Sequence, residues 1–423
     1  MFSQKRPFLD GRFFILHLAL IFARMITISE RGKKMPSSPI RKLASYADAA
    51  KKEGVKVYHL NIGQPDIETP AIMMEAVNNA HLKVLEYTDS AGILSFRKKL
   101  ASYYQSKGID VDYNDILITI GGSEGILFAF MACLDAGDEI IVPEPFYANY
   151  IGFAMAAGIK IIPITSSIET GFALPPIDSF REKITAKTKG IFICNPNNPT
   201  GYVYSEQELL QIRDLIKEKD LYLFSDEAYT EFSYEANVKS TLTLQGVEDR
   251  VIMIDTFSKK YSACGARIGA LVTKNKAVIE AVMKFSQARL SPPTLEQIAA
   301  EAALGLPSDY FDATREEYKN RRDTLINRLS KMKGVYCQVP QGAFYAMAKL
   351  PVDDTDAFCQ WLLTDFRKEN ATIMLAPASG FYTTPGLGKN EVRLAYVLNE
   401  ADIHAAMDCL ELALASYPGR VIS

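Results

Sequence analysis

One segment near residue 260 combines a lysine with two hydroxyl side chains and an arginine. Lys259 follows Thr256 and Ser258, and Arg267 stands between small residues further along the chain. A lysine amine that is desolvated near other cationic groups can form a Schiff base with a carbonyl compound. The hydroxyl groups and the guanidinium could hold a phosphate nearby. Most lysines lie on solvated faces of proteins, and we expect the same of the neighbouring Lys260.

A glycine-rich segment, Gly121–Gly125, follows a predicted strand and opens a predicted helix. Glycines there let backbone N–H groups approach an anion, and the helix N-terminus adds a partial positive charge, so the segment could form a phosphate cup. The same residues fit the Gly-x-Ser-x-Gly nucleophile elbow of hydrolases, with Ser123 as the nucleophile and His404 as the only histidine downstream. A tight turn that requires glycine is a third interpretation. The segment alone does not decide among the three.

Two further segments place polar side chains after predicted strands. In Asn195–Gly201, two prolines fix the backbone at their own positions and restrict the residues before them, Asn198 among these. The result is a stiff turn that presents an amide side chain. In Ser225–Tyr229, the Asp226 carboxylate could pair with a protonated ring nitrogen, and the phenol of Tyr229 could face the same ligand. A solvated acidic turn is the alternative interpretation of this segment.

Short β-branched runs alternate with helical stretches from about residue 115, and this pattern predicts mainly parallel strands that are buried on both faces. In open α/β sheets of this kind, functional residues gather at the carboxyl ends of strands, so we expect the four segments to meet. A capping box at Ser205–Glu208 predicts a helix that runs to about Lys219. The predicted strands cover residues 115–120, 139–142, 160–164, 190–194, 221–225, 251–255 and 268–273.

The pattern changes to a strand-rich, mixed segment after Gly334. We therefore predict a large domain at residues 72–312 and a small α+β domain at residues 313–423, to which an N-terminal segment at residues 25–71 also belongs. Residues 1–24 combine basic side chains with a short apolar stretch. A signal peptide is one interpretation, but no small-x-small cleavage site follows and the stretch is too short to span a bilayer. We expect an upstream or non-native extension, with Met25 as the biological start.

The composition is that of a globular enzyme. Hydrophobic residues make up 48% and charged residues 23% of the 423 residues, and 47 Lys and Arg face 50 Asp and Glu. This balance argues against nucleic acid or a membrane surface as a partner. Six scattered cysteines without a Cys-x-x-Cys pair indicate reduced thiols in a cytoplasmic protein. The four histidines have no metal-ligand spacing, so we expect no metal site.

Taken together, the four segments resemble the binding site of pyridoxal 5′-phosphate (PLP). From about Met25 onward, the chain resembles a class I aminotransferase of the aspartate aminotransferase superfamily, PLP fold type I. Three motifs in this order carry the resemblance: Asn-Pro-x-Asn-Pro-Thr-Gly, Asp-Glu-x-Tyr and Ser-Lys-x7-Arg-x-Gly. It implies a large α/β domain with a mostly parallel seven-stranded sheet flanked by helices, plus a smaller α+β domain.

The resemblance also implies a role for each matching residue. Lys259 would bind the cofactor as a Schiff base and carry protons, Asp226 would pair with the ring nitrogen, and Asn198 and Tyr229 would contact O3′. Tyr147 would stack on the ring. The phosphate would be bound by Arg267, Thr256, Ser258 and the N–H groups around Gly122, Ser123 and Glu124.

For the substrate, the resemblance implies that Arg393 grips the α-carboxylate and that Gly63 lines the site. Tyr87 would reach the phosphate of the neighbouring subunit, which implies a homodimer with shared active sites. The implied reaction moves an amino group between an L-amino acid and a 2-oxo acid, such as 2-oxoglutarate, by a ping-pong mechanism in amino-acid metabolism. Some relatives have a lysine where this chain has Ser123, and Arg289 is a candidate for binding an acidic side chain; a surface helix arginine is its alternative interpretation.

Three other functions stay open at this point. A PLP-dependent carbon–sulfur β-lyase could use the same residues around the cofactor. A serine hydrolase could use Ser123, although the segments around Asn198 and Lys259 would then have no purpose. A non-catalytic PLP-binding regulator is disfavoured because no basic patch accompanies the chain.

Overall fold

The computed structural model describes residues 26–36, 38–39, 41–235, 238–307 and 309–421. The predicted extension at residues 1–24 lies outside these described residues. The chain divides into two compact units, Met1–Pro36 and Ser37–Ser423. In the described part of the first unit, helix α2 (Glu30–Lys34) begins after Ser29, whose Oγ accepts a hydrogen bond from the Gly32 N–H at 3.0 Å. All elements below belong to the second unit.

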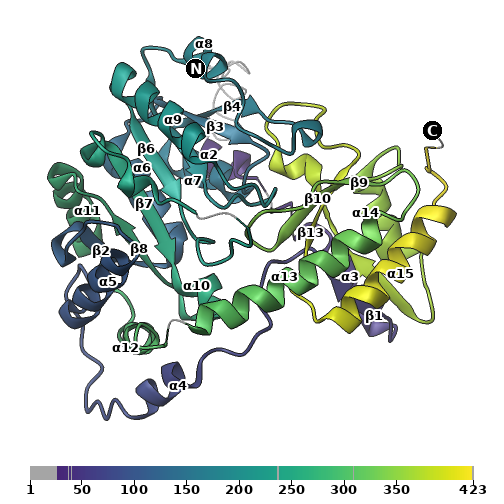
Figure 1. Cartoon of the computed structure of the whole chain (residues 1–423), viewed down its shortest axis with the longest axis horizontal. Helices are drawn as coiled ribbons and strands as arrows, with labels where there is room; N and C mark the ends of the chain where they lie inside the picture. Colours follow the sequence, from purple (N-terminus) through teal and green to yellow (C-terminus); the bar gives the residue numbers. More distant parts are fainter. Residues whose placement is uncertain (1–25, 37, 40, 236–237, 308, 422–423) are drawn as a thin grey trace, which may run out of the picture. The chain divides into compact units, whose positions relative to one another are not determined.

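A seven-stranded sheet forms the centre of the second unit, as predicted (Figure 1). All neighbouring strands are parallel except β8, which is antiparallel to both of its neighbours. In spatial order, the strands are β2 (Ile116–Ile120), β8 (Ile268–Val272), β7 (Val251–Thr256), β6 (Tyr222–Asp226), β5 (Thr188–Cys194), β3 (Glu139–Glu144) and β4 (Lys160–Thr165).

Strand β8 departs from the predicted parallel direction because of its connection to β7. A parallel crossover needs about a dozen residues or more, usually with a full helix. Residues 257–267 instead form the short helix α10 (Phe257–Lys260) and a turn, and the chain folds back so that Thr256 pairs with Gly269. This return places Arg267, at the start of β8, beside the carboxyl end of β7. The antiparallel strand thereby brings the arginine to the lysine segment.

The sheet is buried on both faces. Alternate residues of β7 enter different hydrophobic clusters: Ile252 and Ile254 enter one, and Val251 and Met253 enter the other. This is the two-residue period expected of a strand covered on both sides. The cluster that contains Ile252 and Ile254 also includes side chains of α6 (Gly121–Cys133), α7 (Asn149–Ala157) and α11 (Lys276–Arg289). The cluster that contains Val251 and Met253 includes side chains of α5 (Leu94–Ser106), α8 (Ile177–Lys183), α9 (Glu206–Lys219) and α12 (Thr294–Ala303).

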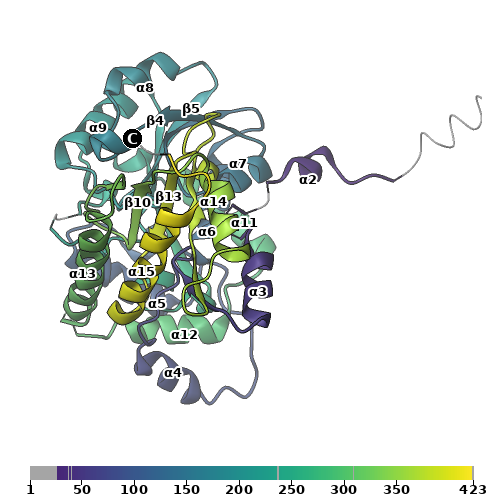
Figure 2. The same ribbon diagram turned by 90° about the vertical axis from the view of Figure 1, so that its right-hand side faces the viewer.

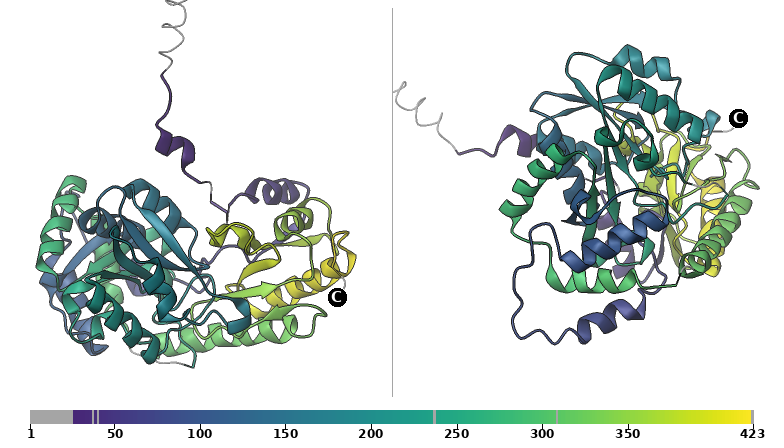
Figure 3. Two further views of the ribbon diagram at one scale, coloured as in Figure 1. Left: turned by 90° about the horizontal axis from the view of Figure 1, so that it is seen from above. Right: turned by 60° about the vertical axis from the view of Figure 1, so that its left-hand side comes forward.

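Helix α9 confirms the predicted capping box. The Ser205 Oγ accepts the Glu208 N–H at 3.3 Å, and the Glu208 carboxylate accepts the Ser205 N–H at 2.7 Å. Segments far apart in the sequence also pack together. Helix α4 (Ala71–Asn78) lies against α12 in Figures 1 and 3. No helix within the described ranges is long and apolar enough to cross a membrane.

A second, antiparallel sheet forms from the C-terminal part of the chain, in the order β12 (Ala376–Pro377), β13 (Glu391–Ala395), β10 (Tyr345–Lys349) and β9 (Tyr336–Cys337). Helix α15 (Glu400–Ser416) lies alongside α13 (Asp309–Leu329), as Figures 1 and 2 show.

The N-terminal segment pairs with this C-terminal part. Strand β1 (Lys56–His59) is parallel to β11 (Ala371–Met374), and α3 (Ala44–Lys52) contacts α14 (Thr355–Thr364). The domain division at residues 25–71, 72–312 and 313–423 stays a prediction. Its last boundary falls within the first turn of α13.

Candidate functional site

A cavity of about 670 Å³ lies where the carboxyl ends of the central strands meet segments from both ends of the chain. This size is in the range of small-molecule sites. Most of the site residues predicted from the sequence line it: Gly63, Gly122, Ser123, Tyr147, Asn198, Asp226, Tyr229, Thr256, Ser258, Lys259, Arg267 and Arg393.

Lys259 is carried by helix α10, directly after β7. Thr256 caps this helix, because its Oγ1 accepts the Ser258 N–H at 3.2 Å. The Lys259 Nζ donates to the carbonyl oxygen of Gly63 at 2.8 Å and lies 3.8 Å from the Cys264 Sγ. Within the described residues, Lys259 forms no ion pair. An amine held by a neutral carbonyl rather than by a carboxylate stays available for reaction with an aldehyde.

Residue 63 must be a glycine because the Tyr345 side chain lies very close to it. A Cβ added at Gly63 would lie 1.8 Å from the Tyr345 hydroxyl oxygen, so any side chain there would displace the tyrosine. Glycine therefore allows the carbonyl of residue 63 and the phenol of residue 345 to face the same cavity. Tyr345 has no counterpart among the residues that we identified from the sequence.

An anion-binding group lies at the N-terminus of α6. The Arg267 Nη1 donates to the Ser258 Oγ at 3.2 Å, and Thr256 Oγ1 donates to the same oxygen at 2.9 Å. Gly121 has a φ of +68°, and a Cβ there would lie 2.3 Å from the Arg267 Nη2. No side chain caps the helix at Ile120. The cation, the hydroxyl groups and the helix N-terminus form a donor set that suits a phosphate ester.

Asp226 ends β6 and is buried in the cavity wall. Its Oδ2 accepts the hydroxyl of Tyr150 at 2.6 Å, and its Oδ1 accepts the Ala228 N–H at 3.2 Å. Burial raises the pKa of Asp226 above its ordinary value, although these hydrogen bonds and Lys259 act in the opposite direction. A cation placed next to this carboxylate would lower its pKa. Tyr150 was not identified from the sequence, because a tyrosine in an apolar helix is an ordinary core residue.

Arg393 lies deep in the cavity on β13, with 1% of its surface exposed. Its Nη1 donates to the Asn198 Oδ1 at 3.0 Å, and its Nη2 donates to the Asn61 carbonyl at 2.6 Å. The guanidinium lies over the Tyr345 ring, 4.4 Å from its centre. Its buried Nε has no hydrogen-bond partner among the described residues. In the part of the chain that the structure describes, this buried guanidinium has one unsatisfied donor and no acidic partner. Such a group suits a carboxylate ligand.

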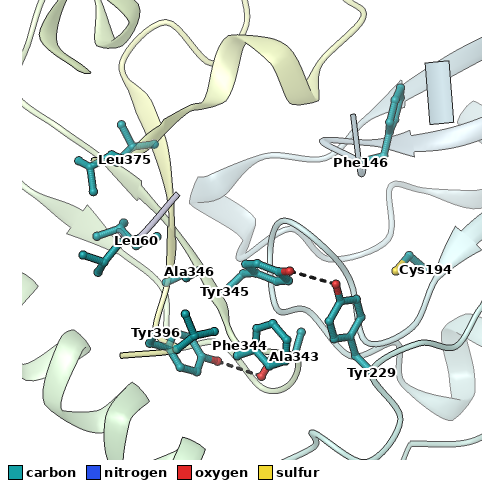
Figure 4. Close-up of a cluster of buried hydrophobic side chains, with 14 of the residues drawn as sticks. Leu60, Phe146, Cys194, Tyr229, Ala343, Phe344, Tyr345, Ala346, Leu375 and Tyr396 are labelled. Carbon is teal, nitrogen blue, oxygen red and sulfur yellow. Dashed lines mark hydrogen bonds between the residues drawn. The ribbon is translucent and has the colours of Figure 1, made fainter. Parts of the chain in front are cut away.

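Two phenols connect the ends of β6 and the C-terminal sheet. The hydroxyl of Tyr229 lies 3.0 Å from that of Tyr345, and Figure 4 shows the two groups directed at one another. The Asn198 Nδ2 donates to the Tyr229 hydroxyl at 3.4 Å. Tyr147 also lines the cavity, and its hydroxyl accepts a hydrogen bond from the Asn149 Nδ2 at 2.7 Å. Burial raises the pKa of Tyr147 to about 12, so this phenol stays neutral.

Three predicted site residues are not part of the cavity lining: Arg289, Glu124 and Tyr87, the last of which was predicted to reach the site of the neighbouring subunit. Arg289 donates to the Glu124 carboxylate at 2.6 Å and to the Ser90 carbonyl at 2.9 Å, so its charge is already paired. This placement does not support the predicted contact with an acidic substrate. The Glu124 side chain also accepts the Ile120 N–H at 2.8 Å. Tyr87 is 78% exposed in a loop.

The hydrolase interpretation finds no support in this arrangement. Ser123 lines the cavity, but His404 is exposed on α15 and lies 3.4 Å from the Arg328 Nη1. His404 is not part of the cavity wall. The hydrolase interpretation required His404 as the base for Ser123, and the structure does not place this histidine at the serine.

Our expectation for Lys260 is wrong. This lysine is 2% exposed, and its Nζ donates to the Asp255 Oδ2 at 2.5 Å. The Tyr104 hydroxyl donates to the same oxygen at 2.9 Å. The pair fixes α10 to β7 and directs the neighbouring Lys259 to the other side. A separate cavity of about 440 Å³ adjoins the pair, and its wall carboxylate Glu231 is likewise paired, with Lys107 at 2.9 Å.

We expect Lys260→Ala to destabilise the fold by about 3–5 kcal/mol, because the variant leaves Asp255 buried without its cation. Urea unfolding measures the change. The double variant Lys260→Ala/Asp255→Asn removes the unpaired charge and should recover part of the lost stability. Equal stabilities of the wild-type protein and the single variant would contradict the structural role of this pair.

The sequence matches the family described as aminotransferase class I and II over residues 55–410. An aspartate aminotransferase of Thermotoga maritima is 33% identical over 390 residues, which cover 91% of this chain and 98% of the relative. The aromatic-amino-acid aminotransferase 2 of Thermococcus litoralis is 32% identical over 397 residues, 92% of this chain and 98% of the relative. Among solved structures, alanine aminotransferase from Pyrococcus furiosus matches with a TM-score of 0.84 at 33% identity, over 91% of this chain and 99% of its own.

Proposed function

Because the chain belongs to the class I and II aminotransferase family, we propose that its cavity binds PLP and exchanges an amino group between an L-amino acid and a 2-oxo acid. The chain is an aminotransferase of the aspartate aminotransferase type, and its family uses PLP. The observation that carries the assignment of the site is that Lys259, whose amine has no acidic partner in the described structure, shares one cavity with the Asp226 carboxylate.

The residues present fit this cofactor. Arg267, Ser258, Thr256 and the N-terminus of α6 would hold its phosphate. Asp226 would hold a proton at the ring nitrogen, and Lys259 would hold the cofactor covalently through its Nζ.

Asn198 and Tyr229 would donate hydrogen bonds to the ring oxygen, and Tyr147 would stack on the ring. When bound, PLP supplies a sink for the electron pair that remains after the Cα–H bond breaks.

Lys259 would move the proton in this reaction. Once an incoming amino acid has displaced its Nζ, the free amine lies next to the substrate and can take the proton from Cα as a general base. Arg393 would bind the α-carboxylate with two of its N–H groups and so orient the Cα–H bond. Lys259 would then give the proton back, and water would release the 2-oxo acid while the amino group stays on the cofactor, which would end the first half-reaction. A second 2-oxo acid would reverse these steps, which gives ping-pong kinetics.

We also propose a homodimer with shared active sites. Tyr87 is exposed together with the apolar side chains of Leu82, Val84 and Leu85 in the same loop. An exposed apolar segment of this kind is typical of an interface. In a dimer, the Tyr87 hydroxyl would contact the phosphate bound by the partner subunit.

Two substrate additions test the proposed function and separate it from the β-lyase alternative. A single amino acid added without a 2-oxo acid should convert the bound cofactor once and then stop. A 2-oxo acid added next should restore the starting absorbance. Continuous release of pyruvate and ammonia from a β-substituted amino acid would identify a lyase, and a colourless protein with no response would contradict the proposed function.

A further inference from the structure

One cationic side chain in the cavity has not been assigned to the cofactor or to the substrate α-carboxylate. Four cationic side chains line the cavity: Lys259, Arg267, Arg393 and Arg41. The first three are assigned to the cofactor and to the substrate α-carboxylate. We propose that Arg41 binds the distal carboxylate of an acidic substrate and is thereby a specificity-determining residue. This inference rests on the proposed function, because it needs the α-carboxylate to occupy Arg393.

The charges of the cavity favour a ligand with several anionic groups. Among the described residues, its lining contains one acidic side chain, that of Asp226, against four cations. The cofactor phosphate would be matched by Arg267, and the substrate α-carboxylate by Arg393. The charge of Arg41 then remains unmatched until a second carboxylate enters. An unmatched cation at a site attracts anionic ligands and discriminates against neutral ones.

Arg41 lies in the exposed part of the cavity wall, together with Ile62 and Gln64, whereas Arg393 lies in the buried part. A substrate whose α-carboxylate binds Arg393 in the buried part of the cavity would extend its side chain towards the rest of the cavity wall. In that wall, Arg41 is the cation that has not been assigned to another group. Across the described residues, Arg41 forms no ion pair. Its neighbour Lys42, by contrast, is paired with Asp356.

The backbone of Arg41 is held in place. Its N–H donates to the Ser38 carbonyl at 3.1 Å, and its own carbonyl accepts the Ala44 N–H at 2.9 Å. Pro39 packs so closely on Gly380 that a Cβ added at Gly380 would lie 2.2 Å from the Pro39 Cβ. A side chain on a fixed backbone loses less conformational freedom when it binds a ligand.

Arg41 also replaces the candidate that the sequence suggested. Arg289 is already paired with Glu124 and does not line the cavity. The planar guanidinium of Arg41 can donate two parallel hydrogen bonds to a carboxylate, which a lysine cannot do.

The test compares an acidic with a neutral substrate in the wild-type holoenzyme and two variants. We expect Arg41→Gln to lower kcat/KM for L-aspartate about 10- to 100-fold, the range for a lost hydrogen-bonded charge contact. The value for L-alanine should stay within about two-fold of wild type. The matched control Lys42→Gln removes a charge from the next residue, outside the cavity lining, and should change neither value.

Two inhibitors provide a second measurement, which does not require turnover of either substrate by the variant. Arg41→Gln should weaken binding of succinate, which has two carboxylates, about 10- to 100-fold and leave butyrate, which has one, unchanged. Equal effects on both substrates and both inhibitors, or no effect on L-aspartate and succinate, would overturn the role of Arg41. If the wild-type protein transaminates no L-amino acid, aromatic ones included, but still binds succinate through Arg41, the proposed function fails and the anion site stands.

Discussion

Replacing Lys259 by alanine should lower the rate of transamination by about four powers of ten or more. The variant loses the proposed general base at the substrate Cα, a role worth about two to four powers of ten, and it also loses the proposed covalent attachment of the cofactor. The neighbouring Lys260 cannot take over this role, because it is buried in its pair with Asp255. Steady-state assays with an amino acid and 2-oxoglutarate measure the loss, and the visible absorbance of the bound aldehyde should change with it.

Two control variants separate the role of the amine from that of the charge. Lys259→Arg keeps the positive charge, but its guanidinium does not lose its proton and cannot form the covalent link. It should be as inactive as Lys259→Ala. Lys284→Ala removes an exposed lysine on α11 and should leave the rate unchanged. Activity of Lys259→Ala within ten-fold of wild type would show that another group moves the proton.

The second large effect is expected for Asp226→Ala. This variant removes the carboxylate proposed to hold a proton at the ring nitrogen, and the rate of proton removal from Cα should fall by about three powers of ten. The proposed phosphate contacts of Arg267, Ser258 and Thr256 do not involve Asp226, so the cofactor should still bind. Single-turnover kinetics with a Cα-deuterated amino acid measure the affected step, because the isotope effect appears only when proton removal limits the rate.

Tyr150→Phe serves as the matched control for Asp226. It removes the 2.6 Å hydrogen bond to the carboxylate but keeps the carboxylate itself. Its effect should therefore be about ten-fold, as for one hydrogen bond to a charged group. If Asp226→Ala reacted as fast as Tyr150→Phe, the ring nitrogen would have a different partner.

Much of the central sheet follows from local sequence. Each strand of the sheet is a short apolar run, and the capping box at Ser205 marks the start of α9. The direction of β8 does not follow from its own residues, since it depends on how residues 257–267 return along β7. Residues in special turns, such as Asn198, were identifiable because the turn chemistry is unusual.

The residues that sequence analysis missed depend on contacts across the fold. Tyr345 and Tyr150 are ordinary core tyrosines until the structure brings them to Tyr229 and Asp226. Arg289 and Glu124 form a pair between distant segments, which no local pattern indicates. The ion pair of Lys260 could have been predicted from the sequence. Asp255 lies five residues earlier, near the end of a buried strand, and a carboxylate at that position indicates that a nearby lysine can be buried as its partner.

The most direct test of this account is reduction of the native protein with borohydride, followed by peptide mapping. Reduction fixes a Schiff base as a stable secondary amine, so the cofactor should remain attached to the peptide that contains Lys259, at its Nζ. The same peptide from Lys259→Arg should carry no label. Recovery of the wild-type peptide unmodified, or of the label on a different lysine, would contradict the central claim.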